Sequence, residues 1–123
     1  MPIFINGQDM TFGKADVLSK TGNYVITTAD FGSTLRMNSG STQIFTLPSV
    51  GSAEDGARLT IVKLGAGQVT IQAADSDLIG ESSAGGTLYN SVAGEIYATV
   101  SLEYVHGSVK WVVRGAHGTW TTT

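Results

Sequence analysis

The clearest indication of the fold is the stretch EIYATVSLEYVHGSVKWVVRGAHGTWTTT, residues 95–123. From Ile96 to Tyr104 every second residue is apolar, whereas Thr99, Ser101 and Glu103 between them are polar. A period of two is typical of a strand with one face on a core and the other in water. The first part of this stretch therefore predicts a half-buried strand.

The second part of the stretch predicts the return strand of a hairpin. His106-Gly107 is suited to a two-residue turn, because glycine accepts the positive φ that such turns require. The chain then returns over residues 108–114, and we expect Val109, Trp111 and Val113 on its inner face. Trp111 is accordingly predicted to be a core residue.

The rest of the chain reads as further short strands separated by turns rich in Gly and Ser. Residues 15–20 form the one expected helical turn. No internal repeat suggests a solenoid. The predicted fold is all-β: a single antiparallel β-sandwich or small barrel of about eight short strands with an N-terminal arm. The expected strands are 24–27, 34–38, 43–47, 57–64, 68–73 and 87–90, followed by the hairpin.

Composition limits the function classes. The chain has 123 residues, no Cys and a net charge of −3, with its Lys and Arg scattered along the sequence. Nucleic-acid binders usually concentrate basic residues on one face, so no nucleic-acid partner is expected. No apolar run approaches the roughly 20 residues of a membrane helix, and the start lacks the pattern of a signal peptide. We expect no membrane partner and no thiol chemistry.

The N-terminal segment differs in character from the rest of the chain. Ile3-Phe4-Ile5 and Phe12 give it much apolar surface, and it is either a first strand docked on its own core or an arm docked on a neighbour. We divide the chain into an arm or attachment segment over residues 1–22, a β-sandwich domain over 23–120 and a tail over 121–123. Ile3, Phe4, Ile5 and Phe12 are the predicted assembly contacts of the arm.

The charged and nucleophilic residues do not assemble a catalytic site. Asp75, Asp77 and Glu81 have cation-like spacing, but the pattern of a calcium loop is absent and a solvated turn is the simpler interpretation. His106 and His117 have no triad partner beside them. The protein is expected not to be an enzyme and to need no metal or cofactor, and cation binding by the three acids stays open.

Two aromatic residues are candidate contacts. Trp120 follows the last predicted strand, so it either folds back on the core or contacts a partner, and it joins the predicted assembly interface. Tyr97 lies on the polar face of its predicted strand, with Thr99 and Glu103, and is the best candidate for an exposed aromatic contact. With Ser83, in the loop 82–86, Tyr97 forms the candidate ligand-contact pair.

The order of several motifs resembles the small β-rich domains of tailed-bacteriophage structural proteins, such as fibres, spikes and head decorations. The resemblance covers roughly residues 23–120 and depends on the order of the motifs, since each one alone is degenerate. The motifs are TLP at 46–48, ARLTIV at 57–62, VTIQ at 69–72, DLIG at 77–80, KWVV at 110–113 and GTW at 118–120.

This resemblance implies a non-enzymatic virion protein, usually a homotrimer, made in the host cytoplasm. The chain has neither the long shaft nor the anchor domain of a complete fibre, so a capsid decoration or cement protein, or a short head or tail appendage, is expected. Its partners would be the major capsid protein or other virion proteins. The alternative is a host-surface glycan-binding module of a tail fibre that uses Tyr97, Trp120 and the loop 82–86. A free enzyme domain is a third, unsupported class.

Overall fold

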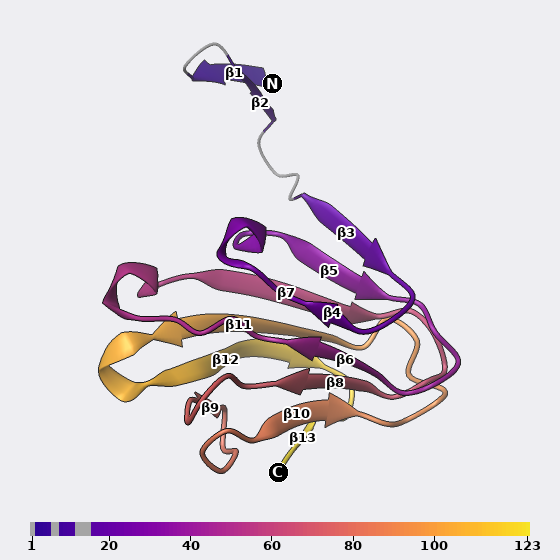
Figure 1. Cartoon of the computed structure of the whole chain (residues 1–123). Helices are drawn as coiled ribbons and strands as arrows, with labels where there is room; N and C mark the ends of the chain where they lie inside the picture. The colour runs from indigo at the N-terminus through magenta and orange to yellow at the C-terminus, as the bar shows by residue number, and fades with distance from the viewer. Residues whose placement is uncertain (1, 6–7, 12–15) are drawn as a thin grey trace.

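The computed structural model describes the backbone of residues 2–5, 8–11 and 16–123, and the side chains of residues 16–123. Two sheets face each other with the core between them (Figure 1). Outside the strands, the described residues form turns and three short 3₁₀ segments: η1 (Thr28–Asp30), η2 (Ser52–Glu54) and η3 (His106–Ser108). The all-β prediction is confirmed.

The strands of the described residues fall into one sheet of six, one sheet of five and a separate pair. The six-stranded sheet has the order β3 (Val17–Lys20), β5 (Thr34–Met37), β7 (Arg58–Lys63), β11 (Thr99–Val105), β12 (Lys110–His117), β9 (Leu78–Ile79). The five-stranded sheet has the order β13 (Thr121–Thr122), β10 (Thr87–Asn90), β8 (Val69–Gln72), β6 (Gln43–Thr46), β4 (Tyr24–Val25). The pair is antiparallel and consists of β1 (Pro2–Ile5) and β2 (Gln8–Thr11).

Both sheets are mixed, so the prediction of an antiparallel sandwich of about eight strands is wrong in its details. From β3 to β8 the chain alternates between the sheets, and each strand from β3 to β6 pairs in parallel with the strand two places further on. Leu35, for example, aligns with Leu18 on one side and with Ile61 on the other. This half of the domain is wound like a solenoid, whereas β10, β11 and β12 make antiparallel pairs.

The solenoid winding has no signature in the sequence, because its coils differ in length. Val17 aligns with Thr34 and Thr34 with Thr60, so equivalent positions do not recur at a fixed spacing. An alternating apolar pattern also fits a parallel and an antiparallel neighbour equally well. The direction of each strand is therefore decided by how the whole chain packs.

The core lies between the sheets and is centred on aromatic side chains. Trp111 is fully buried, as predicted, and its ring centroid lies 5.4 Å from that of Tyr104 and 5.8 Å from that of Phe31. Phe45 is fully buried and meets Tyr24 edge to face at 6.4 Å. Burying each large apolar side chain contributes roughly 1.5–3 kcal/mol, so these residues dominate the packing energy.

The predicted hairpin is confirmed, with a different turn. Val105 pairs with Lys110, and the residues between them form η3 followed by Val109 in the left-handed conformation at φ 51°. This conformation turns Val109 outward, so its side chain is 45% exposed instead of lying beside Trp111. Ile96 precedes the strand and is also exposed.

The helical turn expected over residues 15–20 is absent, because residues 17–20 form strand β3 instead. Pairing with β5 supplies its backbone hydrogen bonds, and Leu18 packs against the core. At the other end of the chain, Thr121 and Thr122 pair with Tyr89 and Leu88 of β10 as strand β13. Segments close to both termini therefore belong to the sheets.

Candidate functional site

Tyr97 is exposed at the end of the loop that joins β10 to β11. Its side chain is 68% exposed, and its backbone has a φ of 73°, a conformation that aromatic residues rarely adopt. Val92 and Ile96 of the same loop are exposed as well. The exposed position predicted for Tyr97 is confirmed, and its use as a ligand contact stays a prediction.

A buried lysine fixes this loop. Lys63 is fully buried, and its Nζ donates a hydrogen bond of 2.9 Å to the carbonyl oxygen of Val92. The backbone N–H of Tyr97 donates to the carbonyl oxygen of Lys63 at 2.7 Å. Burial of an ammonium group is costly unless it is hydrogen-bonded, so the loop and the lysine depend on each other.

Asn90 and Glu95 connect the same loop to the C-terminal segment. The Asn90 Nδ2 donates to Glu95 Oε1 at 2.8 Å, and the Asn90 Oδ1 accepts from the backbone of Val92 at 3.0 Å. Glu95 also accepts from the backbone N–H of Thr119 at 2.7 Å and from its hydroxyl at 2.9 Å. The hydrogen bond from the Thr119 backbone, with those from Asn90 and the Thr119 hydroxyl, lowers the pKa of Glu95.

Trp120 folds back on its own domain. It is half-buried against the core, and its Nε1 donates to the carbonyl oxygen of His117 at 3.0 Å. Part of its surface lines a groove with a volume of about 620 Å³. One part of the Trp120 side chain therefore packs against the core and another part faces the groove. Its predicted contact with a partner stays a prediction.

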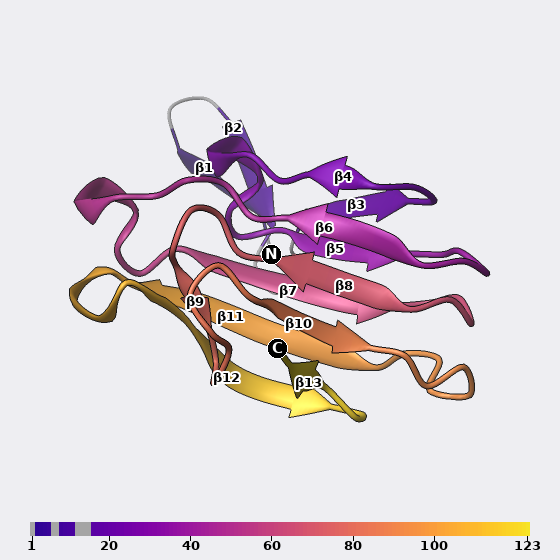
Figure 2. The same cartoon turned by 60° about the horizontal axis from the view of Figure 1, so that its bottom comes forward.

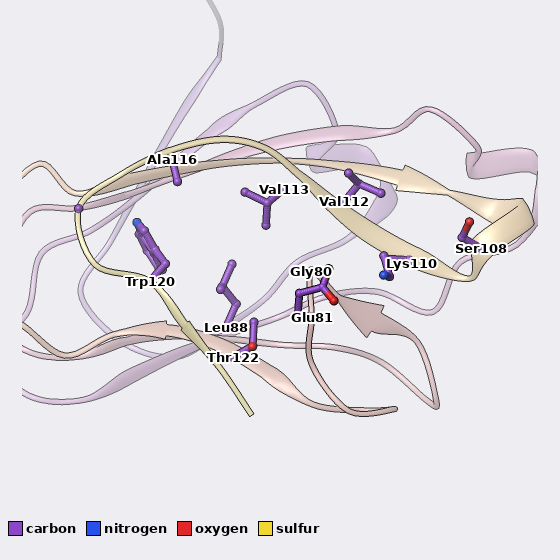
Figure 3. A pocket seen from close by; sticks show the side chains of 11 residues that line it. Gly80, Glu81, Leu88, Ser108, Lys110, Val112, Val113, Ala116, Trp120 and Thr122 are labelled. Atoms are coloured by element: carbon purple, nitrogen blue, oxygen red, sulfur yellow. The ribbon is translucent and has the colours of Figure 1, made fainter.

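The groove lies between β12 on one side and β10 with β13 on the other (Figure 3). Trp120 stands at one end of the groove, and Lys110 and Ser108 stand at the other. Most of the side chains that line it are apolar, with Glu81 and Lys110 as the two charged groups. The apolar lining consists of Leu88, Val112, Val113, Ala116 and Trp120.

The three acidic residues that flank β9, Asp75 and Asp77 before it and Glu81 after it, do not form one site. Asp75 accepts a hydrogen bond of 2.6 Å from the Ser49 hydroxyl, Asp77 is buried, and Glu81 is exposed at the groove. Burial, with the neighbouring Asp75, raises the pKa of Asp77. Within residues 16–123 no three His, Asp or Glu side chains are placed to hold a metal ion.

Ser83 and Tyr97 are held at opposite ends of β10. The Ser83 hydroxyl donates to the carbonyl oxygen of Thr123 at 3.2 Å, beside the start of the strand, whereas Tyr97 follows the loop at its other end. The structure does not bring this predicted pair together. The side chains of Ile3, Phe4 and Ile5, and the whole of Phe12, lie outside the described residues.

Lys63 and Asn90 are functional-site residues that were not predicted from the sequence. Along β7 the buried positions are Leu59, Ile61 and Lys63, so the period of two already placed this lysine on the inner face. Asn90 takes the buried position after Leu88 in the same way. Lys63 and Asn90 each stand at the same alternating positions as the buried apolar residues of their strand. A charged or amide side chain at such a position is unusual, and this signal could have identified the two residues from the sequence.

No helix among the described residues has the length and apolar character required to cross a membrane. No protein-family model matches the sequence, and no curated protein matches it either.

Proposed function

We propose that this protein is a non-enzymatic structural protein of a bacteriophage virion, a capsid decoration protein or a short head or tail appendage that attaches through its N-terminal segment. The observed all-β fold is compatible with the resemblance of residues 23–120 to phage structural domains. The proposal takes the protein to be a homotrimer whose partners are capsid or other virion proteins.

The observation that carries the proposal is a pair of open strand edges at one end of the domain. β3 ends the six-stranded sheet and β4 ends the five-stranded sheet, at the same end of the two facing sheets (Figure 2). Among the described residues nothing pairs with their outer edges. Val17 on β3 and Val25 on β4 are 40% and 64% exposed. Open edges of this kind favour pairing with another chain, and the N-terminal segment leads directly into β3.

The mechanism we propose is cementing. Apolar side chains of the segment 1–15 would be buried against neighbouring virion subunits, at a gain of roughly 25 cal/mol per Å² of apolar surface. Symmetric repetition of the contact would multiply a modest affinity into stable attachment.

Two measurements test the proposal. Particles from the source lysate are labelled with gold-tagged antibody to this protein and imaged in negative stain, and we expect gold on the capsid lattice or on a tail appendage. In a second assay the chain lacking residues 2–12 is expected to lose attachment to particles that lack the protein. Absence of gold from all particles would overturn the proposal.

A second candidate function is recognition of a host-surface glycan, and Tyr97 favours it. A strained backbone that holds an aromatic side chain in solvent is a feature of binding sites. Lys63, Asn90 and Glu95 rigidify its loop, and preorganisation reduces the entropic cost of binding. The face of a tyrosine ring suits the apolar side of a sugar.

Titration with host saccharides, followed by tryptophan fluorescence and calorimetry, tests this second candidate. A glycan receptor is expected to give a saturable signal that Tyr97→Ala removes, whereas Val109→Ala, an exposed control residue, leaves it unchanged. The same titration on a cement protein is expected to give no signal.

A further inference from the structure

The outer edge of β12 is largely unpaired. β9 pairs in parallel with Lys110 and Trp111 alone, and in the part of the chain that the structure describes no strand covers the edge of residues 112–117. On its other side β12 pairs with β11 along its whole length, through a register shift opposite Ser101 and Leu102. The six-stranded sheet therefore has room for one more strand beside β12.

The groove lies directly beside this free edge. Val113 and Ala116 of β12 form one wall, and Leu88 of β10 faces them from the other sheet (Figure 3). Gly80, the residue after β9, lies next to Val113 and Thr122. A strand added along residues 112–117 would place alternate side chains into the groove and complete the layer between the sheets.

We propose that this edge and groove accept the N-terminal strand of a second copy of the protein. Residues 2–5, Pro-Ile-Phe-Ile, are uncharged and apolar, and their backbone already has the conformation of a strand. The groove is about 620 Å³ in volume and has a mostly apolar lining, which suits two or three such side chains. The inference rests on the proposed function, since it assigns an acceptor surface to the same segment.

The positions of donor and acceptor in the sheet predict the type of assembly. The N-terminal segment enters the domain at β3, one edge of the six-stranded sheet, and the acceptor edge of β12 lies near the opposite one. Contact between copies is then head to tail. A head-to-tail contact forms a ring if its rotation closes, and a cyclic trimer is one such ring.

Disulfide trapping tests the inference cleanly, because the chain has no Cys of its own. One chain carries Ile3→Cys, Phe4→Cys or Ile5→Cys, and a second chain of different size carries Ala116→Cys. Paired strands bring Cα atoms to about 4.5–5.5 Å, within the range of a disulfide, so mixing under mild oxidation is expected to link the two chains. Ser52→Cys, an exposed position on η2, is the matched control acceptor and is expected not to link.

A second measurement does not depend on cysteines. Light scattering of the full chain is expected to give an oligomer, and Ala116→Asp, a charge at an exposed position of the groove, is expected to give monomers with an unchanged circular dichroism spectrum. Linkage equal to the Ser52→Cys control, or a monomeric full chain, would overturn the inference. A disulfide within one chain of the double variant Phe4→Cys/Ala116→Cys, formed at a rate independent of protein concentration, would also overturn the inference. The N-terminal strand would then occupy the groove of its own chain.

The outcome is separable from that of the proposed function. If trapping fails while deletion of residues 2–12 abolishes attachment to particles, the segment docks on another virion protein and only the inference fails. If copies link through the groove but no particle carries the protein, the proposed virion function fails. The inferred contact between copies then still holds.

Discussion

At the scale of single residues, the Glu95 carboxylate accepts three hydrogen bonds in the polar network around the Tyr97 loop. It joins Asn90, at the end of β10, to Thr119, next to Trp120. The same loop carries the carbonyl of Val92 that satisfies the buried Lys63. One carboxylate therefore connects the exposed tyrosine to the wall of the groove.

The state of Glu95 predicts a pH dependence. Because its pKa is lowered on folding, the carboxylate stabilises the fold above the unfolded value of about 4.3, and this stabilisation is lost as the pH falls through the folded pKa. Glu95→Gln is expected to lower the Tm at pH 7 and to differ less from the parent below about pH 4. Thermal melts of the parent and Glu95→Gln at the two pH values, monitored by tryptophan fluorescence, measure these Tm differences.

The matched control for that prediction is Glu81→Gln, since Glu81 is exposed and makes no hydrogen bond to the described residues. Its Tm at pH 7 is expected to equal that of the parent. A Tm of Glu95→Gln that matches the parent at pH 7 would show that the network contributes nothing to stability.

At the scale of elements, two turns of the solenoid-like half stack backbone on backbone. The turn between β7 and β8 contains Gly65 and Gly67, and the turn between β5 and β6 contains Ser39 and Ser41. A Cβ added at Gly65 or Gly67 would lie 2.2 Å from the carbonyl oxygen of Ser39 or Ser41 respectively. The turns can approach this closely because both positions are glycine.

This stacking predicts a strong effect of a single methyl group. Gly67→Ala is expected to destabilise the domain by about 1–3 kcal/mol or more, because the opposing atoms are backbone and cannot move independently. Gly40→Ala, in the neighbouring turn, has nothing within 4 Å of the added Cβ and is the control. Urea unfolding measures both, and equal midpoints would contradict the stacking argument.

At the scale of the whole molecule, the described core is contained in the two-sheet domain. Its buried apolar residues run from Ile26 to Trp111, and Leu18 and Trp120 pack at its periphery. Deletion of residues 2–12 is therefore expected to leave a folded chain whose Tm is within about 4 °C of the parent, a shift that corresponds to roughly 1 kcal/mol. Differential scanning calorimetry checks this, and an unfolded truncation would mean that the segment is part of its own core.

The sequence predicted much of the fold because burial follows local alternation. Val100, Leu102 and Tyr104 are buried in phase and Trp111 is in the core, as predicted. The same reasoning placed Tyr97 in solvent. It could not place Val109, since a left-handed backbone at that residue depends on how the hairpin closes.

The order of residues alone specifies a chain of short strands with one apolar face each, because the period of two belongs to the residues themselves. Packing of the whole chain sets the parallel winding of β3 to β8, the separation of Ser83 from Tyr97, the burial of Lys63 against the Val92 carbonyl and the open edge of β12. These features depend on which segments meet across long stretches of chain. The free energy of such pairing is shared among distant residues, and no local pattern records it.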